Sequence, residues 1–401
     1  MISYVPALCM WLTTADRLKR RQSRERAFFY VQTRTKSNQL LTSELVALMA
    51  VSSTLFLFLH TRELHLRLEQ MQVKFQPEES FSSDEKNGVG TMMRQLKTSV
   101  DMEELDVNAL NNTRKSPKDI LFFNRVPKVG SQTFMEMLRR LSARNKFDFH
   151  RDHIQRVETI RIGVREQYDL SRMIDTFSPP AVYVKHICFV NFTSYRIPQP
   201  IYVNMVRDPV ERVISWYYYV RAPWYYVERK QAFPDLPLPD PSWLKKDFET
   251  CVLQHDRECQ YIEGETREGI GDHRRQTMFF CGQGNECLPF NSQAALENAK
   301  RAVEENYAVV GILEDMNTTL TVLENYIPRF FKGSSYIYQV EMQGFRKINR
   351  NAFKPTISEE IKNIIRRNFT REIEFYQFCR QRLHKQLYAL KLPTMSDNSL
   401  K

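Results

Sequence analysis

The chain has 401 residues, of which 42% are hydrophobic, and it carries a formal net charge of +11. This length excludes a large multidomain assembly, because it accommodates one large domain or two small ones. The basic excess favours an acidic partner, whose class depends on the compartment in which the chain works.

The first 60 residues have the pattern of a membrane anchor. Residues 1–39 form a basic tail, whereas residues 40–60 are mostly apolar and carry Glu44 as their only formal charge. A positive flank before an apolar run predicts an uncleaved signal anchor with a cytoplasmic N-terminus, although the best part, residues 45–59, is shorter than the roughly 20 residues that a bilayer requires. The alternative is a buried core helix, but nothing around the segment supplies a matching core.

The segment after the anchor differs in composition from the rest of the chain. Residues 61–118 are poor in aromatic residues and rich in Glu, Gln, Lys and Ser, which predicts a lumenal stem that acts as a flexible spacer. A short amphipathic helix next to the membrane is the alternative. Residues 119–390 are expected to form the compact domain, and residues 391–401 a flexible tail.

Sequons and cysteines agree with a lumenal domain. Four N-x-[ST] sequons occur, at Asn111, Asn191, Asn317 and Asn368. The seven cysteines comprise two close pairs and three that stand apart; they are Cys251 with Cys259, Cys281 with Cys287, and Cys9, Cys188 and Cys379. A zinc site would show tighter CxxC spacing with nearby histidines, so two local disulfides are favoured in an oxidising lumen.

A strand, a loop and a helix are expected at the start of the compact domain. Residues 120–123 are apolar, Pro127 and Gly130 mark a turn, and apolar residues recur at helical spacing over residues 134–141. Such a turn points backbone N–H groups and the positive end of a helix at one place, where an anion is favoured. Lys128 adds a cation, and Ser131 and Thr133 add hydroxyl donors. The alternative is an ordinary turn between a strand and a helix.

Further strands and helices alternate along the domain. Strands are expected at residues 181–184, 200–206 and 307–313, and helices at residues 210–220, 320–331 and 358–391. This alternation predicts an α/β domain with a mainly parallel sheet. Because ligands gather at the carboxyl ends of such strands, one crevice is expected to hold Lys128, His186 and Arg207. The long terminal helix implies no chemistry of its own.

An aromatic cluster occupies residues 216–219 and 224–226, followed by a proline-rich loop at residues 233–241. The aromatic rings suit the protein core, a platform on which sugars stack, or both, and most of them are expected in the core.

The two anion-binding elements resemble those of sulfotransferases that use 3′-phosphoadenylyl sulfate (PAPS). Residues 124–131 (NRVPKVGS) resemble the loop that binds the 5′-phosphosulfate, and residues 206–215 (VRDPVERVIS) resemble the element that binds the 3′-phosphate. This likeness implies the P-loop-like, three-layer sulfotransferase fold with a central, mainly parallel sheet.

Over residues 119–385 the chain is similar to the uronosyl 2-O-sulfotransferases of glycosaminoglycan synthesis. Residues 185–192 (KHICFVNF), 279–287 (FFCGQGNEC) and 310–315 (VGILED) support this closer likeness. The resemblance implies a single-pass type II Golgi membrane protein whose lumenal domain acts on heparan sulfate or a related acidic glycan, and it makes a homotrimer an expectation. It also implies the disulfides Cys251–Cys259 and Cys281–Cys287.

The resemblance assigns roles to individual residues. His186 would be the base that removes the proton from the 2-hydroxyl of a uronic acid, and Lys128 would stabilise charge on the departing phosphate. Arg125 and Arg221 would face the acidic sugar. The residues that would bind PAPS are Arg125, Lys128, Gly130, Ser131, Gln132, Thr133, Arg207, Ser215, Arg346 and Lys347.

The chain also departs from this family at two positions and in one loop. Val184 stands where the heparan enzyme has a second histidine, and Gln132 replaces a Thr or Arg. The loop at residues 221–243, expected to bind the sugar, differs in sequence and length. The identity of the acceptor glycan therefore does not follow from that of a relative.

Three other functions are alternatives to sulfotransfer. A P-loop kinase or NTPase would need a GK[ST] sequence and a carboxylate that binds Mg²⁺. The loop at residues 124–131 has no GK[ST] sequence. A lectin-like binder of acidic glycans, descended from the enzyme, is the main alternative. A lumenal location removes nucleic acid as a partner. The sequence shows no carboxylate-rich metal site, and no metal is expected.

Overall fold

The computed structural model describes residues 105–153, 155–156, 159–267, 273–341 and 354–392. The predicted basic tail, the membrane anchor, most of the stem and nearly all of the C-terminal tail lie outside these residues, as do Arg346 and Lys347. Among the described helices, none combines the length and the apolar character that crossing a bilayer requires.

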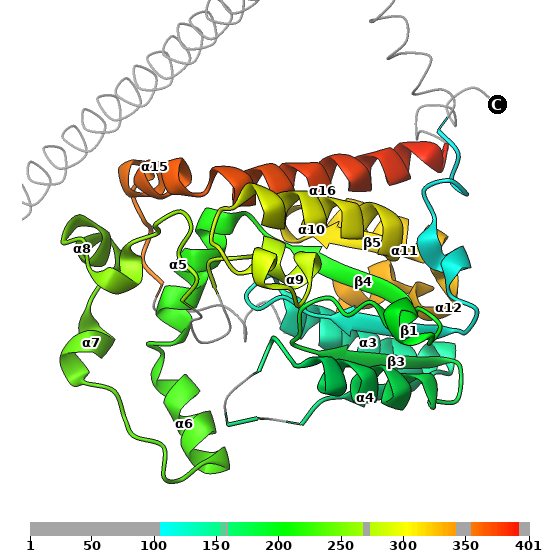
Figure 1. Cartoon of the computed structure of the whole chain (residues 1–401), viewed down its shortest axis with the longest axis horizontal. Coiled ribbons are helices and arrows are strands. Elements are labelled where there is room, and N and C mark those ends of the chain that lie inside the picture. Colours follow the sequence, from blue (N-terminus) through cyan, green and yellow to red (C-terminus); the bar gives the residue numbers. More distant parts are fainter. Residues whose placement is uncertain (1–104, 154, 157–158, 268–272, 342–353, 393–401) are drawn as a thin grey trace, which may run out of the picture. The chain divides into compact units, whose positions relative to one another are not determined.

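Five parallel strands form one sheet in the order β2-β3-β1-β4-β5 (Figure 1). They are β1 (Ile120–Asn124), β2 (Asp148–Arg151), β3 (Ala181–Lys185), β4 (Ile201–Val206) and β5 (Tyr307–Ile312). Every residue of β1, β4 and β5 is buried, which explains their continuous apolar sequences. The prediction of an α/β domain with a parallel sheet is confirmed. β2 was not predicted, because this half-exposed edge strand has no apolar run.

Helices cover both faces of the sheet. The crossovers from β1 to β2 and from β4 to β5 run in opposite directions, so right-handed connections place α3 and α10 on opposite faces. The helices are α3 (Ser131–Asn145), α4 (Val164–Asp175), α5 (Pro209–Tyr219), α6 (Pro223–Ala232), α7 (Pro241–Lys245), α8 (Phe248–Leu253), α9 (Thr277–Cys281), α10 (Gln293–Asn306), α11 (Met316–Tyr326), α12 (Pro328–Phe331), α13 (Ser334–Tyr336), α15 (Glu359–Asn368) and α16 (Thr370–Ala389).

Two helices that were predicted as continuous are each divided in two. The segment at residues 320–331 breaks at Ile327, whose φ of −135° is not helical, because the following Pro328 disfavours helical backbone before it. The terminal segment breaks at Phe369, where the ring packs against Tyr261 and Phe290 with centroids 4.9 Å away from each. As a result α15 packs against α5, while α16 runs along β5 and alongside α10 (Figure 1).

The apolar residues form a main core around the sheet and a second, smaller core. The second core joins α5, α8 and α15 through residues such as Val213, Phe248 and Ile361. The predicted disulfides are confirmed: Cys251–Cys259 lies in this second core, and Cys281–Cys287 joins the last residue of α9 to the segment that follows it. Cys188 and Cys379 are buried, and neither belongs to a disulfide.

The chain joins the packed body upstream of residue 119, where the compact domain was expected to begin. The short helix η1 (Asn112–Lys115) carries Asn112, whose Nδ2 donates to the carbonyls of Glu304 (2.7 Å) and Tyr307 (2.9 Å). Val107 and Leu110 pack on the main core. The last residues of the predicted stem therefore belong to the body.

Candidate functional site

The loop between β1 and α3 contacts the residues that follow both neighbouring strands. On one side, His186 follows β3 and its Nδ1 lies 2.9 Å from the carbonyl oxygen of Arg125. On the other side, Arg207 follows β4 and its Nη1 donates to the carbonyl of Lys128 (3.3 Å). The structure thus gathers Lys128, His186 and Arg207 at the carboxyl edge of the sheet, where one crevice was expected.

The backbone of this loop requires the glycine at residue 130. Lys128 and Gly130 both have left-handed backbone conformations, with φ of 64° and 77°. A Cβ at Gly130 would also come within 2.5 Å of Cδ1 of Leu313. Because Gly130 is the N-cap of α3, the helix begins with no side-chain cap. In contrast, Asp208 Oδ1 caps α5 by accepting from the backbone N–H of Glu211 (2.9 Å). The N-terminus of α3 is therefore the better of the two for an anion.

Lys128 has an unusual electrostatic environment. Its Nζ lies 3.6 Å from the centroid of the Tyr219 ring, which attracts a cation. Burial, followed by the positive charges of Arg207 and Lys354, lowers the pKa of Lys128 to about 7. The amine is therefore close to half neutral at neutral pH, and an anion placed beside it would restore its charge.

His186 is oriented as a base by its hydrogen bond to the Arg125 carbonyl. A carbonyl only accepts, so the proton of the neutral imidazole is on Nδ1, and Nε2 is the nitrogen that can receive another. Burial and the charge of Arg125 hold the pKa of His186 well below its usual range, although the hydrogen bond opposes this. The ring is consequently neutral at neutral pH, and its Nε2 lone pair is available to accept a proton. Val184, at the departure from the family pattern, is buried within β3.

Arg207 lies between two carboxylates and has an unused donor. Its Nη2 lies 3.6 Å from Oε2 of Glu211, and its Nε lies 3.9 Å from Oε1 of Glu314. Nε is buried and has no hydrogen-bond partner among the described residues, because Glu314 is too far away to accept. Ser215 is half-buried on α5, one helical turn beyond Glu211. The donor on Arg207 therefore precedes α5, and the Ser215 hydroxyl lies in the middle of that helix.

Two buried polar residues that sequence reasoning missed support this edge. Arg212 is fully buried; its Nε donates to the carbonyl of Pro127 (2.9 Å), and its Nη1 donates to the carbonyl of His273 (2.9 Å). It therefore fastens the loop before Lys128 to α5. Arg212 lies in the motif at residues 206–215, but the sequence does not show which backbone group an arginine will reach.

Asn124, the last residue of β1, joins the strands behind the site. Its Oδ1 accepts from Asn204 Nδ2 (3.1 Å) and from the Tyr307 hydroxyl (3.0 Å). Its Nδ2 donates to the carbonyls of Ile187 (3.3 Å) and Phe279 (3.2 Å). This buried amide therefore ties β1, β4 and β5 to the segment that follows His186.

The other described residues that were predicted to bind PAPS lie around the start of α3. Ser131 is buried as its first residue, and Thr133 is half-buried. Arg125 Nη2 donates to Oε1 of the exposed Gln132 (3.3 Å), and its Nη1 contacts the sulfur of Met135 at 3.2 Å. Gln132, the second departure from the family pattern, thus holds the Arg125 side chain.

Arg221 lies apart from this group. Its guanidinium is sandwiched between the rings of Tyr217 (3.4 Å) and Trp243 (3.9 Å), and it forms a 2.6 Å ion pair with Glu258. Only 4% of the side chain is exposed. Contact of Arg221 with an acidic sugar remains a prediction, and it would require this arrangement to open.

The rings of the aromatic cluster divide between the core and the surface. Trp216 and Tyr217 are buried, four of the tyrosines are half-buried, and Trp224 is 41% exposed. Fewer rings are thus fully in the core than expected, because α6, which carries three of them, has no buried residue.

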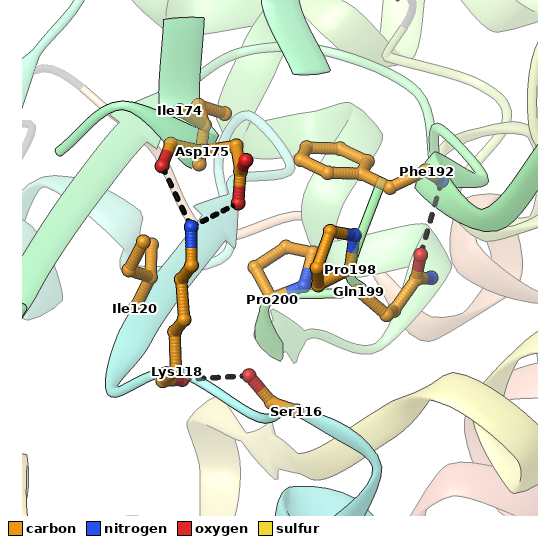
Figure 2. A pocket seen from close by; sticks show the side chains of 9 residues that line it. All are labelled: Ser116, Lys118, Ile120, Ile174, Asp175, Phe192, Pro198, Gln199 and Pro200. Carbon is orange, nitrogen blue, oxygen red and sulfur yellow. Dashed lines mark hydrogen bonds and ion pairs between the residues drawn. The ribbon is translucent and has the colours of Figure 1, made fainter. Parts of the chain in front are cut away.

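A shallow hollow lies at the opposite edge of the sheet (Figure 2). It is formed near the amino ends of β1 and β4, by residues that include Ile120 and Pro200. Lys118 crosses it and donates to both the carboxylate (2.6 Å) and the carbonyl (3.0 Å) of Asp175. Lys118 and Asp175 are therefore hydrogen bonded to each other and have a structural role, and the hollow offers no second candidate site.

Comparison with known proteins agrees with this geometry. Residues 111–379 match the profile of the sulfotransferase family. The chain belongs to this family. It is 46% identical to the uronyl 2-sulfotransferase homolog pip of Drosophila melanogaster, over 70% of this chain and 55% of that protein. It is also 31% identical to the human uronyl 2-sulfotransferase, over 67% of this chain and 64% of that protein, and 29% identical to the mouse heparan sulfate 2-O-sulfotransferase 1, over 65% and 69%.

The likeness to the uronosyl 2-O-sulfotransferases that the motifs indicated is therefore confirmed. The matched part of this sulfotransferase-family chain covers just over half of the Drosophila protein and just under two thirds of the human one.

Proposed function

We propose that the chain transfers a sulfuryl group from PAPS to the 2-hydroxyl of a uronic acid in a glycosaminoglycan or a related glycoconjugate. The observation that carries this proposal is the loop between β1 and α3. This loop carries the amine of Lys128. Its backbone carbonyls accept hydrogen bonds from Arg207, the proposed phosphate ligand, on one side and from His186, the proposed base, on the other.

The residues of the site fit a nucleotide with phosphates at two positions. The uncapped N-terminus of α3, the left-handed turn at Gly130 that leads into it and the Lys128 amine suit the 5′-phosphosulfate. The unused Nε of Arg207, together with Ser215, suits the 3′-phosphate. When bound, PAPS supplies the sulfuryl group and a phosphate leaving group.

The two catalytic residues have complementary tasks. Nε2 of His186 receives the proton of the attacking hydroxyl, while the Nδ1–H group goes on donating to the Arg125 carbonyl and keeps the ring in place. The protonated Lys128 amine faces the negative charge that develops on the leaving phosphate. Because His186 is already neutral, no proton has to leave it before the hydroxyl binds.

The acceptor class follows from the relatives, whose names specify uronyl and heparan sulfate 2-sulfotransfer. An acidic glycan also suits the net charge of +11. We propose a lumenal Golgi location with the membrane anchor at residues 40–60, and assembly as a homotrimer. Asn191, Asn317 and Asn368 are exposed, as glycosylation in that lumen requires, whereas Asn111 is half-buried and its Nδ2 lies 3.5 Å from the Tyr326 carbonyl.

The full chain, expressed in membranes and solubilised, provides the test. Transfer of radiolabelled sulfate from PAPS would be measured on native and desulfated glycosaminoglycans, with disaccharide analysis of the product. The variant His186→Asn should lose transfer but keep nucleotide binding. His255→Asn is the matched control, because His255 is exposed and far from the site in sequence.

Label on the 2-position of a uronic acid that disappears only in His186→Asn would establish the reaction. Nucleotide binding without transfer to any acceptor would favour the lectin-like alternative. Absence of both binding and transfer would overturn the proposal.

A further inference from the structure

The C-terminal helix α16 contacts the candidate nucleotide site indirectly, through two of its residues. Glu372 is fully buried and Tyr376 is 6% exposed, and the two lie one turn apart on the same face of the helix. Each is hydrogen bonded to a residue that in turn holds the backbone that follows β4. The sequence implied no chemistry for this helix.

The first connection runs from Glu372 through Gln276 to Arg207. Oε2 of Glu372 accepts from the backbone N–H groups of Gln276 (2.7 Å) and Thr277 (3.2 Å), and Oε1 accepts from the Thr277 hydroxyl. Burial raises the pKa of Glu372 to about 7, while these donors favour its ionised form. The carboxyl group therefore holds the start of α9, where Gln276 is the N-cap residue.

The side chain of Gln276 then brackets the backbone of Arg207. Its Oε1 accepts from the N–H of Arg207 (3.0 Å), and its Nε2 donates to the carbonyl of the same residue (2.7 Å). Gln276 is fully buried. One amide thus satisfies both backbone groups of Arg207, the residue that follows β4 at the candidate site.

The second connection runs from Tyr376 through Glu314 to Asp208. The Tyr376 hydroxyl donates to Oε2 of Glu314 (3.1 Å), and Oε1 of Glu314 accepts from the N–H of Asp208 (3.1 Å). Because Asp208 caps α5, this contact fixes the backbone immediately after Arg207. The two connections hold consecutive residues from different directions.

We propose that Gln276 is a positioning residue for recognition of the 3′-phosphate, and that α16 supports it through Glu372 and Tyr376. This inference rests on the proposed function, in which Arg207 binds that phosphate. An arginine binds a phosphate well only if its fork is aimed before the ligand arrives, because otherwise binding must also order the side chain. A backbone held at both its N–H and its carbonyl provides that aim.

The test compares two nucleotides on the full chain. Isothermal titration calorimetry would measure the affinities for adenosine 3′,5′-bisphosphate and for adenosine 5′-monophosphate, which lacks the 3′-phosphate. Gln276→Met keeps the length of the side chain and removes both hydrogen bonds. We expect this variant to lower the affinity for the bisphosphate about 10-fold and the affinity for the monophosphate less than about 2-fold, because only the bisphosphate has the 3′-phosphate that contacts Arg207. In the Arg207→Ala background, Gln276→Met should have no further selective effect.

The matched control is Gln199→Met. Gln199 is also buried and also accepts from a backbone N–H, that of Phe192 (3.0 Å), but it lies at the opposite edge of the sheet. It should leave the ratio of the two affinities unchanged. If Gln276→Met fails to fold, Tyr376→Phe removes a single hydroxyl from the second connection, and we expect a selective loss of about 2-fold to 3-fold.

Equal weakening of both nucleotides by Gln276→Met would show a purely structural role and overturn the inference. An unchanged ratio of the two nucleotide affinities in Tyr376→Phe would overturn the inference that α16 supports recognition of the 3′-phosphate. Failure of the wild-type chain to bind either nucleotide would instead overturn the proposed function.

Discussion

The carboxyl edge of the sheet and the arm at residues 223–245, which contains α6 and α7, are built in opposite ways. At the edge, polar side chains such as Asn124, Arg212 and Gln276 are buried and hydrogen bonded to backbone groups. In the arm, neither α6 nor α7 has a buried residue, and Figure 1 shows both standing away from the sheet. Val227 and Leu238 are exposed there.

The ionic contacts show the same contrast. Arg156 and Asp235, which link the arm to the segment after β2, are 2.7 Å apart but more than half exposed. Exposed pairs of this kind contribute little, whereas a buried arginine that loses its partners is costly. Under the proposed function, the edge performs a step common to all acceptors, and the arm is free to differ between acceptors.

The largest expected effect is on the transfer rate, at the edge. Lys128→Met removes the cation beside the leaving phosphate and should lower the turnover number about 1,000-fold. Lys118→Met is its control, because Lys118 pairs with Asp175 at the opposite edge and should keep full activity. A loss of less than about tenfold for Lys128→Met would show that Lys128 is not the group that stabilises the leaving phosphate.

A second effect at the edge is on stability. Arg212→Met leaves the carbonyls of Pro127 and His273 without their buried donor, and should lower the free energy of unfolding by about 3 kcal/mol. Arg229→Met, in the arm, should lower it by less than about 1 kcal/mol. Urea unfolding followed by circular dichroism would measure both, and equal losses would abolish the distinction between the two regions.

The charge of Lys128 predicts proton uptake when a nucleotide binds. With a pKa of about 7, most of the amines are neutral at pH 8 in the ligand-free protein. A bound phosphate raises the pKa, so binding of adenosine 3′,5′-bisphosphate should take up about 0.9 proton at pH 8 and about 0.1 at pH 6.

Calorimetry in buffers of different ionisation enthalpy measures this uptake. Lys128→Arg is the reference, because an arginine stays charged and the nucleotide's own titration remains. The difference between wild type and Lys128→Arg at pH 8 should vanish if Lys128 is already protonated in the free protein.

The smallest effect is expected in the arm. Trp224→Ala removes a ring that is 41% exposed and packs edge-on against Tyr219, and it should lower the free energy of unfolding by about 1 kcal/mol. Nucleotide affinity should stay unchanged, while the KM for a glycan acceptor should rise about 5-fold if the ring stacks on a sugar. Tyr388→Ala removes an exposed ring on α16 as a control. A KM equal to that of the control would place acceptor binding outside this part of the arm.

Much of the fold and the outline of the site could be read from local patterns. The continuous apolar runs of β1, β3, β4 and β5 predicted a buried parallel sheet, because such strands are covered on both faces. Gly130 and Lys128 marked the turn that is predicted to bind an anion, and the close spacing of the cysteines indicated local disulfides. These features depend on neighbours within a few residues, so the chain itself displays them.

Long-range contacts decided the rest. The proton of His186 is placed by the carbonyl of Arg125, which is 61 residues away, and Arg207 is held by Gln276, which is 69 residues away. Arg221 is expected from the family resemblance to face an acidic sugar, but the sequence does not show that the fold encloses it between two rings and pairs it with Glu258. A side chain's chemistry is visible in the sequence, but the groups that bury, orient or neutralise it come from distant segments that only folding brings together.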